Sequence, residues 1–240
     1  MRNPSDTLIV ALDGSLDEAQ KWTQECRGIA GWVKIGMTLY YAEGPKIVEA
    51  FTAQGFNVFL DLKLYDISHQ VENAAYELGK LGVGMFTVHA SGGPEMMRAA
   101  KRGSAKGAIE AGLPEPTMLA VTVLTSFTGE DLFLTGLDNN VPAQVFRLAK
   151  LALENDADGI VCSPQEASFL RSALGNDFAI VTPGVRPSWA SADDQRRITT
   201  PSDAISYGST HLVVGRPITG HESPKIAAQS VLDEITEALA

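Results

Sequence analysis

The chain has 240 residues, of which 45% are hydrophobic and 20% are charged, a composition typical of a globular protein with a sizeable core. Its formal net charge of -10 argues against general binding to nucleic acid or to an anionic membrane, although a small anionic substrate can still bind at a locally basic site. Cys26 and Cys162 belong to no CxxC or Cys/His cluster, and the opening apolar run is too short for a signal peptide, so we expect no zinc site, no disulfide framework and a cytoplasmic location.

Short apolar runs rich in β-branched residues alternate with longer segments of helical periodicity along the chain. The runs show little polar alternation, which indicates strands buried on both faces, as in a parallel sheet. We expect strands at residues 7–13, 32–36, 57–63, 85–90, 117–125, 159–163, 178–183 and 211–215.

The segments between these runs carry helix signals. Ser15 and Glu18 form a possible capping box, and apolar residues follow at helical spacing. Residues 143–153 and 225–239 show the same periodicity. Glycines stand where several helices should end, at positions 55, 82, 112 and 175.

The eight βα units of about 30 residues each favour one closed (β/α)8 TIM barrel, with residues 1–240 as a single domain. An open doubly wound sheet is the alternative, but it would place a glycine-rich phosphate turn after the first strand, and Asp13-Gly14-Ser15 is not such a turn. Two long polar loops, at residues 128–140 and 186–201, are candidate lids over a site.

The strongest chemical signal is Asp61-Leu62-Lys63 at the end of the third strand. Residues two apart on a strand point to the same face, so if Leu62 faces the helices, Asp61 and Lys63 point into the barrel mouth. Burying these charges is unfavourable unless they are paired. An isolated Asp-x-Lys pattern fits a structural ion pair as well as a catalytic one.

Two further charged residues favour the catalytic interpretation. Lys34 lies inside the apolar second strand, and a lone buried lysine is rare. The second and third strands are neighbours, so Lys34 and Asp61 can meet. Asp13 ends the first strand beside them, although an aspartate there can also cap a helix. These groups converge at the carboxyl-terminal rim, where TIM barrels carry their active sites.

The last two strands predict a phosphate site, because the loops that follow them usually grip phosphate in this fold. Strand seven leads to Arg186, and strand eight leads to Gly215 and Arg216. Gly215 lets backbone approach an anion, and Arg216 offers a bidentate fork, but a tight turn with a surface arginine is also possible. His89 ends strand four, where we expect a hydrogen-bonded structural histidine. The histidine spacing does not indicate a metal centre.

Taken together, these motifs resemble the short bacterial form of the orotidine 5'-phosphate decarboxylase family over nearly the whole chain. The matching segments are Asp61-Leu62-Lys63-x-x-Asp66-Ile67, Lys34-Ile35-Gly36, Val88-His89-Ala90, residues 121–126, residues 182–186, Asp194-Gln195-x-Arg197 and residues 214–218.

The resemblance implies cofactor-free decarboxylation of orotidine 5'-phosphate to uridine 5'-phosphate in de novo pyrimidine biosynthesis, by a homodimer with shared sites. Lys63 is then the proton donor, with Lys34 and Asp61 from the same subunit, while Asp66 and Ile67 reach the neighbour's site. The other implied contacts are Asp13 and Lys34 with ribose, Thr125 with the pyrimidine, Gln195 with base and phosphate, and Arg186, Gly215 and Arg216 with phosphate.

The position of Asp66 in the chain also suggests that its side chain points away from its own barrel. It lies three residues beyond Lys63, after the strand has ended, so it does not continue the alternation of Asp61 and Lys63. The apolar neighbours Tyr65 and Ile67 suit an interface, although an aspartate there can also cap the next helix.

The chain departs from the family pattern directly after Ile67. Family members usually continue from the Asp-Ile pair with Pro, a polar residue and a ribose-binding Thr, whereas this chain has Ser68-His69-Gln70. We expect the Gln70 amide to make a similar hydrogen bond, with altered ribose contacts. Alternatives on the same barrel are a magnesium-dependent 3-keto-gulonate 6-phosphate decarboxylase or hexulose-phosphate synthase, and a catalytically silent phosphate-binding regulator.

Overall fold

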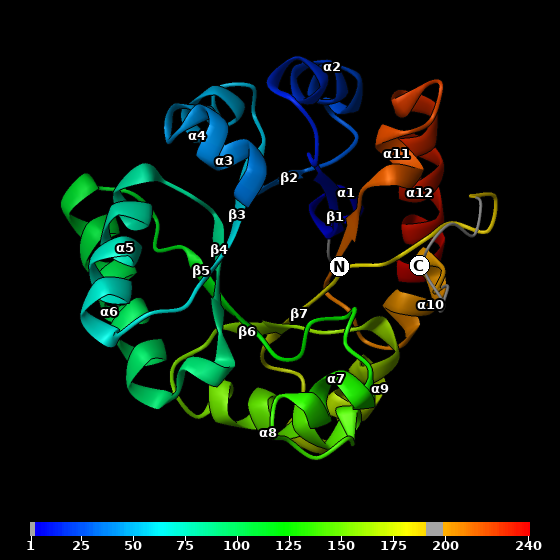
Figure 1. Ribbon diagram of the computed structural model, residues 1–240. Coiled ribbons are helices and arrows are strands. Elements are labelled where there is room, and N and C mark those ends of the chain that lie inside the picture. The colour runs from blue at the N-terminus through cyan, green and yellow to red at the C-terminus, as the bar shows by residue number, and fades with distance from the viewer. Residues whose placement is uncertain (1–2, 191–198) are drawn as a thin grey trace.

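Parallel strands close into an eight-stranded barrel in the computed structural model, which describes residues 3–190 and 199–240 (Figure 1). Each strand pairs in parallel with the next along the chain, and the last pairs with the first. The strands are β1 (Leu8–Ala11), β2 (Trp32–Gly36), β3 (Asn57–Leu64), β4 (Met85–His89), β5 (Thr117–Val121), β6 (Gly159–Val161), β7 (Ala179–Thr182) and β8 (His211–Val214).

The closed barrel confirms the fold expected from the sequence and excludes the open doubly wound sheet. Several strands are shorter than their apolar runs. The run at 117–125, for example, continues past β5, because Val123 and Leu124 no longer pair in the sheet but line a cavity at its mouth. An apolar run therefore marks buried chain, of which the strand is only a part.

Helices surround the barrel (Figure 1). The helical elements are α1 (Pro4–Thr7), α2 (Leu16–Cys26), α3 (Met37–Glu43), α4 (Lys46–Thr52), α5 (Ser68–Leu81), the short 3-10 turn η1 (Ala90–Gly92), α6 (Pro94–Ala111), α7 (Gly129–Leu134), α8 (Val141–Leu153), α9 (Pro164–Leu174), α10 (Pro201–Ser206), α11 (Arg216–Thr219) and α12 (Pro224–Leu239). In the described part of the chain, no helix is both long and apolar enough to cross a membrane.

The capping box predicted from Ser15 and Glu18 is present at the start of α2. The Ser15 hydroxyl accepts a hydrogen bond from the Glu18 amide at 3.4 Å, and the Glu18 carboxylate accepts one from the Ser15 amide at 2.8 Å. The segment 128–140, expected as a polar loop, contains the short helix α7. A second capping box, formed by Thr128 and Asp131, starts that helix.

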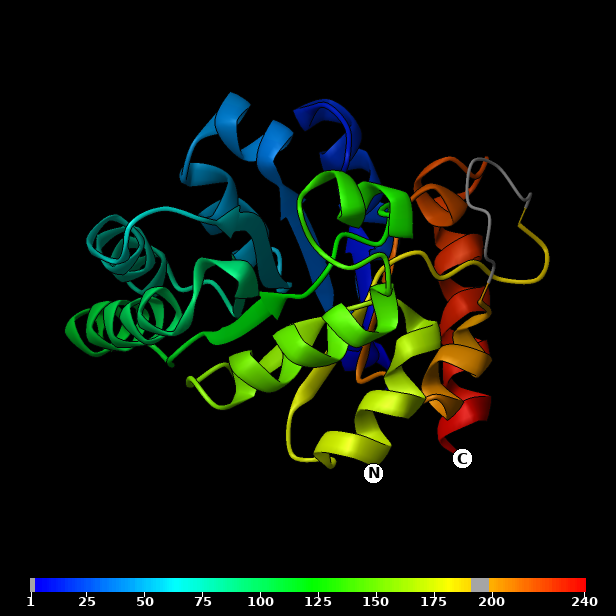
Figure 2. The same cartoon turned by 60° about the horizontal axis from the view of Figure 1, so that its bottom comes forward.

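Two helices pack closely enough to exclude side chains. α5 and α6 lie side by side in both views (Figures 1 and 2). Any Cβ at Gly79, Gly103 or Gly107 would meet backbone atoms of the opposite helix. This contact fixes α5, which begins just after the Asp66-Ile67 segment, against the rest of the barrel wall.

The barrel interior is filled by a compact apolar layer below the mouth. Its buried members are Ile9, Ala11, Phe59, Met85, Leu119, Val181 and Val213. These residues come from alternate positions of their strands, as expected for side chains pointing inward. Two residues beyond Ala11 and Phe59, the same alternation brings Asp13 and Asp61 to the mouth.

Candidate active site

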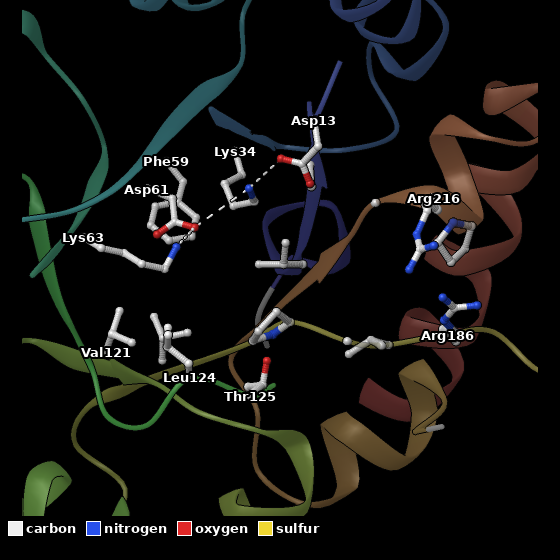
Figure 3. Close-up of a pocket in the computed structure, with 18 of the residues that line it drawn as sticks. Asp13, Lys34, Phe59, Asp61, Lys63, Val121, Leu124, Thr125, Arg186 and Arg216 are labelled. Carbon is white, nitrogen blue, oxygen red and sulfur yellow. Dashed lines mark hydrogen bonds and ion pairs between the residues drawn. The ribbon is translucent and has the colours of Figure 1, made fainter. Parts of the chain in front are cut away.

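A cavity of about 350 Å³ opens at the carboxyl ends of the strands. Its floor is apolar and comes from Ala11, Phe59, Val121, Val161 and Val213. Charged side chains rise from this floor on one side, and two arginines lie on the opposite side (Figure 3). The site is thus a water-accessible pocket that has an apolar floor and charged side chains above it.

The charged side is a chain of alternating charges contributed by β2, β3 and the residues after β1 (Figure 3). The Lys63 Nζ donates to Asp61 Oδ2 at 2.8 Å. The Lys34 Nζ lies 3.9 Å from the same Asp61 oxygen and donates to Asp13 Oδ1 at 3.0 Å. The sequence predicted that these four residues meet, and the structure confirms their contact.

Burial differs along this chain of charges. The side chains of Lys34 and Asp61 are 12% and 14% exposed, that of Lys63 is 28% exposed, and that of Asp13 is 65% exposed. Charges removed from water need close partners, and the three less exposed residues, Lys34, Asp61 and Lys63, have them. The partly exposed Lys63 ammonium group also faces the cavity, so it is available to a bound molecule.

The end of β3 departs from a regular strand. Leu60 pairs with Phe86 and Leu64 pairs with Val88, so the three residues 61–63 oppose Thr87 alone. Lys63 has a φ of +52°, in the left-handed region that non-glycine residues rarely adopt. Leu62 packs against the outer core, as predicted, but Lys63 reaches the cavity through this bulge rather than by simple alternation.

Thr87 of β4 holds the bulge. Its hydroxyl accepts a hydrogen bond from the Lys63 amide at 2.9 Å and donates one to Asp61 Oδ1 at 2.9 Å. Thr87 was not among the residues predicted from the sequence. The signal was a threonine at an inward position of β4, between Met85 and His89, where an apolar residue is expected.

His89 lies beside the charged set. Burial and the nearby Lys63 ammonium lower the pKa of His89, while Asp61 opposes that shift. The ring packs edge-on against Tyr65, with 5.7 Å between the ring centroids. The aromatic contact suits a structural role, but the predicted hydrogen bond is not found, because the His89 ring has no hydrogen-bond partner among the described residues.

The opposite side of the cavity is basic. Arg186 follows β7 and is 4% exposed, and Arg216 begins α11 directly after Gly215 (Figure 3). Guanidinium groups match phosphate oxygens in charge and geometry. Both arginines and Gly215 line the cavity, as does Thr125 from the segment after β5.

The other predicted site residues lie elsewhere. Asp66, Ile67 and Gln70 are exposed and do not belong to the described lining of the cavity. Asp66 Oδ1 accepts a hydrogen bond from the Ile67 amide at 2.7 Å. Gln195 lies outside the described residues. Nowhere in residues 3–190 and 199–240 do three or more His, Cys, Asp or Glu side chains form a group suited to a metal ion.

Comparison with known proteins places this geometry in a family. The family model "Orotidine 5'-phosphate decarboxylase / HUMPS family" matches residues 6–231. The orotidine 5'-phosphate decarboxylase of Heliobacterium modesticaldum is 46% identical over 237 residues, covering 98% of each chain. That of Syntrophotalea carbinolica is 46% identical over 233 residues, covering 97% of this chain and 96% of the relative.

A solved structure agrees with the sequence relatives. The crystal structure of orotidine 5'-phosphate decarboxylase from Lactobacillus acidophilus matches with a TM-score of 0.85 and 39% identity, covering 96% of this chain and 99% of that one. The matches span the barrel and every element that carries the charged set and the arginines. The chain therefore belongs to the orotidine 5'-phosphate decarboxylase / HUMPS family.

Proposed function

We propose that this chain decarboxylates orotidine 5'-phosphate to uridine 5'-phosphate in de novo pyrimidine biosynthesis, without a cofactor. The observation that carries the proposal is the Asp13–Lys34–Asp61–Lys63 charge chain, which shares one cavity with Arg186 and Arg216. An anionic nucleotide needs cations at its phosphate, and its decarboxylation needs a fixed cation at the reacting carbon.

Lys63 is the proposed proton donor. When the bond between the ring carbon and the carboxylate breaks, carbon dioxide leaves and the electron pair stays on the ring carbon. A fixed ammonium group stabilises this developing negative charge and then transfers a proton to the same carbon. The 2.8 Å ion pair with Asp61 holds the ammonium nitrogen at the cavity wall.

The remaining contacts are the ones that the family resemblance implies. Arg186, Arg216 and Gly215 bind the phosphate, and Thr125 contacts the pyrimidine ring. Asp13 and Lys34 bind the ribose between them. Binding the phosphate far from the reacting carbon provides free energy that positions the ring. We assign Gln195 to a contact that bridges base and phosphate.

We further propose a two-fold homodimer in which each subunit completes its partner's site. Asp66 and Ile67 supply this contribution from the segment after β3, and Gln70 nearby is the proposed ribose contact. Their exposure outside their own cavity supports the proposal, as does the apolar surface of Tyr65 and Ile67, which are 60% and 69% exposed. A two-fold axis makes the exchange reciprocal.

The test follows the loss of orotidine 5'-phosphate absorbance, with and without a chelator. Turnover that is equal in both samples supports the proposal. Turnover that falls with chelator and returns with magnesium points to a metal-dependent decarboxylation of this substrate. Binding of the nucleotide without turnover in either sample points to a phosphate-binding regulator or to one of the sugar-phosphate enzymes named above. The last two outcomes contradict cofactor-free catalysis.

A further inference from the structure

Thr87 is a polar side chain in an apolar place. It lies in the middle of β4, points into the barrel and is 0% exposed. It sits behind Asp61, outside the described residues that line the cavity. Burying a hydroxyl group is unfavourable unless its hydrogen bonds are satisfied, so its partners decide what it does there.

The two hydrogen bonds of Thr87 have a fixed direction. A carboxylate only accepts and a backbone amide only donates. The single hydroxyl proton therefore goes to Asp61 Oδ1, at 2.9 Å, and the Thr87 oxygen accepts the Lys63 amide hydrogen, also at 2.9 Å. One side chain thus bonds to both partners of the central ion pair.

The hydrogen bond between the Thr87 hydroxyl and the Lys63 amide takes the place of a ladder hydrogen bond that the bulge removes. Residues 61–63 leave the ladder between β3 and β4, and a buried amide without a partner is costly. Left-handed backbone at a non-glycine residue also persists only where its surroundings enforce it. The Thr87 oxygen satisfies the Lys63 amide in that conformation.

The bond to Asp61 sets the rotation of its carboxylate. With Oδ1 held by Thr87, Oδ2 is the oxygen that meets Lys63 Nζ at 2.8 Å and faces Lys34 Nζ at 3.9 Å. We infer that Thr87 is a positioning residue of the proposed reaction, which fixes the backbone of Lys63 and the carboxylate of Asp61 together. This inference rests on the proposed function, since it concerns the alignment of the proton donor.

The first test is Thr87→Val, which keeps the shape of the side chain and removes the hydroxyl. We expect kcat for orotidine 5'-phosphate to fall by about 10- to 100-fold, because a small misplacement of a catalytic group has effects of that size. KM and the affinity for uridine 5'-phosphate should change by less than about threefold, since the residue touches neither the arginines nor the cavity.

Thr7→Val is the matched control. Thr7 is also 0% exposed, at the end of α1, and its hydroxyl has no hydrogen-bond partner among the described residues. This variant should keep the wild-type kcat. The pair Thr87→Ser and Thr87→Ala covers the case in which the valine variant does not fold. Both lack the methyl group and they differ only in the hydroxyl, so serine should restore most of the kcat that alanine loses.

Three results would overturn the inference. They are a folded Thr87→Val enzyme with kcat within about twofold of wild type, serine and alanine variants that are equally impaired, and a loss confined to KM. Failure of the proposed function looks different, because wild-type protein itself would then leave orotidine 5'-phosphate unchanged.

Discussion

Lys63 combines a left-handed backbone conformation with a charged side chain. Its φ of +52° places the ammonium group against Asp61 and the cavity at once. We predict that Lys63→Ala lowers kcat by roughly 10³-fold or more, because the transition state loses its fixed cation. The variant should still bind uridine 5'-phosphate, as measured by calorimetry.

The matched control for that variant is Lys46→Ala, which removes an exposed lysine on α4 and should retain full turnover. Near-normal turnover in folded Lys63→Ala protein would contradict the assignment of the proton donor.

Arg216 tests the other side of the cavity. We predict that Arg216→Ala weakens the transition-state binding of orotidine 5'-phosphate by about 1.5–3 kcal/mol, the range for a hydrogen bond to a charged group. Orotidine, which lacks the phosphate, should be turned over equally by both proteins. Comparing kcat/KM for the two substrates checks this, and equal losses for both would refute a phosphate contact.

His89 gives a prediction for stability against pH. Burial and Lys63 lower its pKa from the ordinary value of 6.5, so the unfolded chain takes up the proton first on acidification. Stability should therefore fall as the pH drops below about 6.5, and fall less in His89→Asn. Urea unfolding of both proteins between pH 7 and pH 5 measures the difference. Parallel stability profiles would show that His89 does not titrate as expected.

At the residue scale, the sequence identified the charged set but not how it is built. Strand alternation correctly predicted that Asp61 and Lys63 both lie at the barrel mouth. Lys63, however, reaches the mouth through a bulge, which simple alternation does not predict. Thr87 was missed because its importance depends on the neighbour across the sheet, and register is a tertiary property. Local patterns reveal which side chains are unusual, while pairing between strands decides what they touch.

At the scale of elements, glycines decide how two helices meet. Gly107 on α6 faces the Tyr76 carbonyl of α5, and a Cβ there would overlap it. We predict that Gly107→Ala lowers the free energy of unfolding by about 1–3 kcal/mol, the usual effect of overpacking. This loss outweighs the gain of up to about 1 kcal/mol in helix propensity.

The control is Ile109→Ala on the same helix, where the side chain is 79% exposed and its loss should change stability little. Urea unfolding measures both variants. Wild-type stability in Gly107→Ala would mean that the helices separate without cost.

The elements themselves were largely predictable. The strands appeared in the expected order, and glycines at 82, 112 and 175 directly follow α5, α6 and α9. The helix α7 was missed because it is too short for helical periodicity to show, and capping by Thr128 and Asp131 defines it better. Strand ends were extended too far because buried chain continues beyond the hydrogen-bonded ladder.

At the scale of the whole molecule, the cavity is basic although the chain as a whole is acidic. The chain carries a net charge of -10, yet its cavity gathers Lys34, Lys63, Arg186 and Arg216. A locally basic cavity lets an acidic protein attract a small anion. Bulk composition does not reveal such a cavity, because its basic character depends on which strand ends converge.

The proposed dimer makes the final prediction, because it assigns Asp66 to the partner's site. Lys63→Ala and Asp66→Asn should each be nearly inactive alone. When the two are mixed, dissociated and reassociated, each heterodimer holds one site with both lesions and one with neither. Random reassociation makes half of the dimers heterodimers, so about a quarter of wild-type activity should return.

The matched control mixes Lys63→Ala with Asp61→Asn, whose lesions both belong to the subunit that carries the cavity. Every site in that heterodimer keeps one lesion, because the Asp61 and Lys63 side chains pair within one chain at 2.8 Å. That mixture should stay inactive under the same conditions. If Asp66 serves its own subunit, the first mixture behaves like the control, and the exposed Tyr65–Ile67 segment requires another explanation.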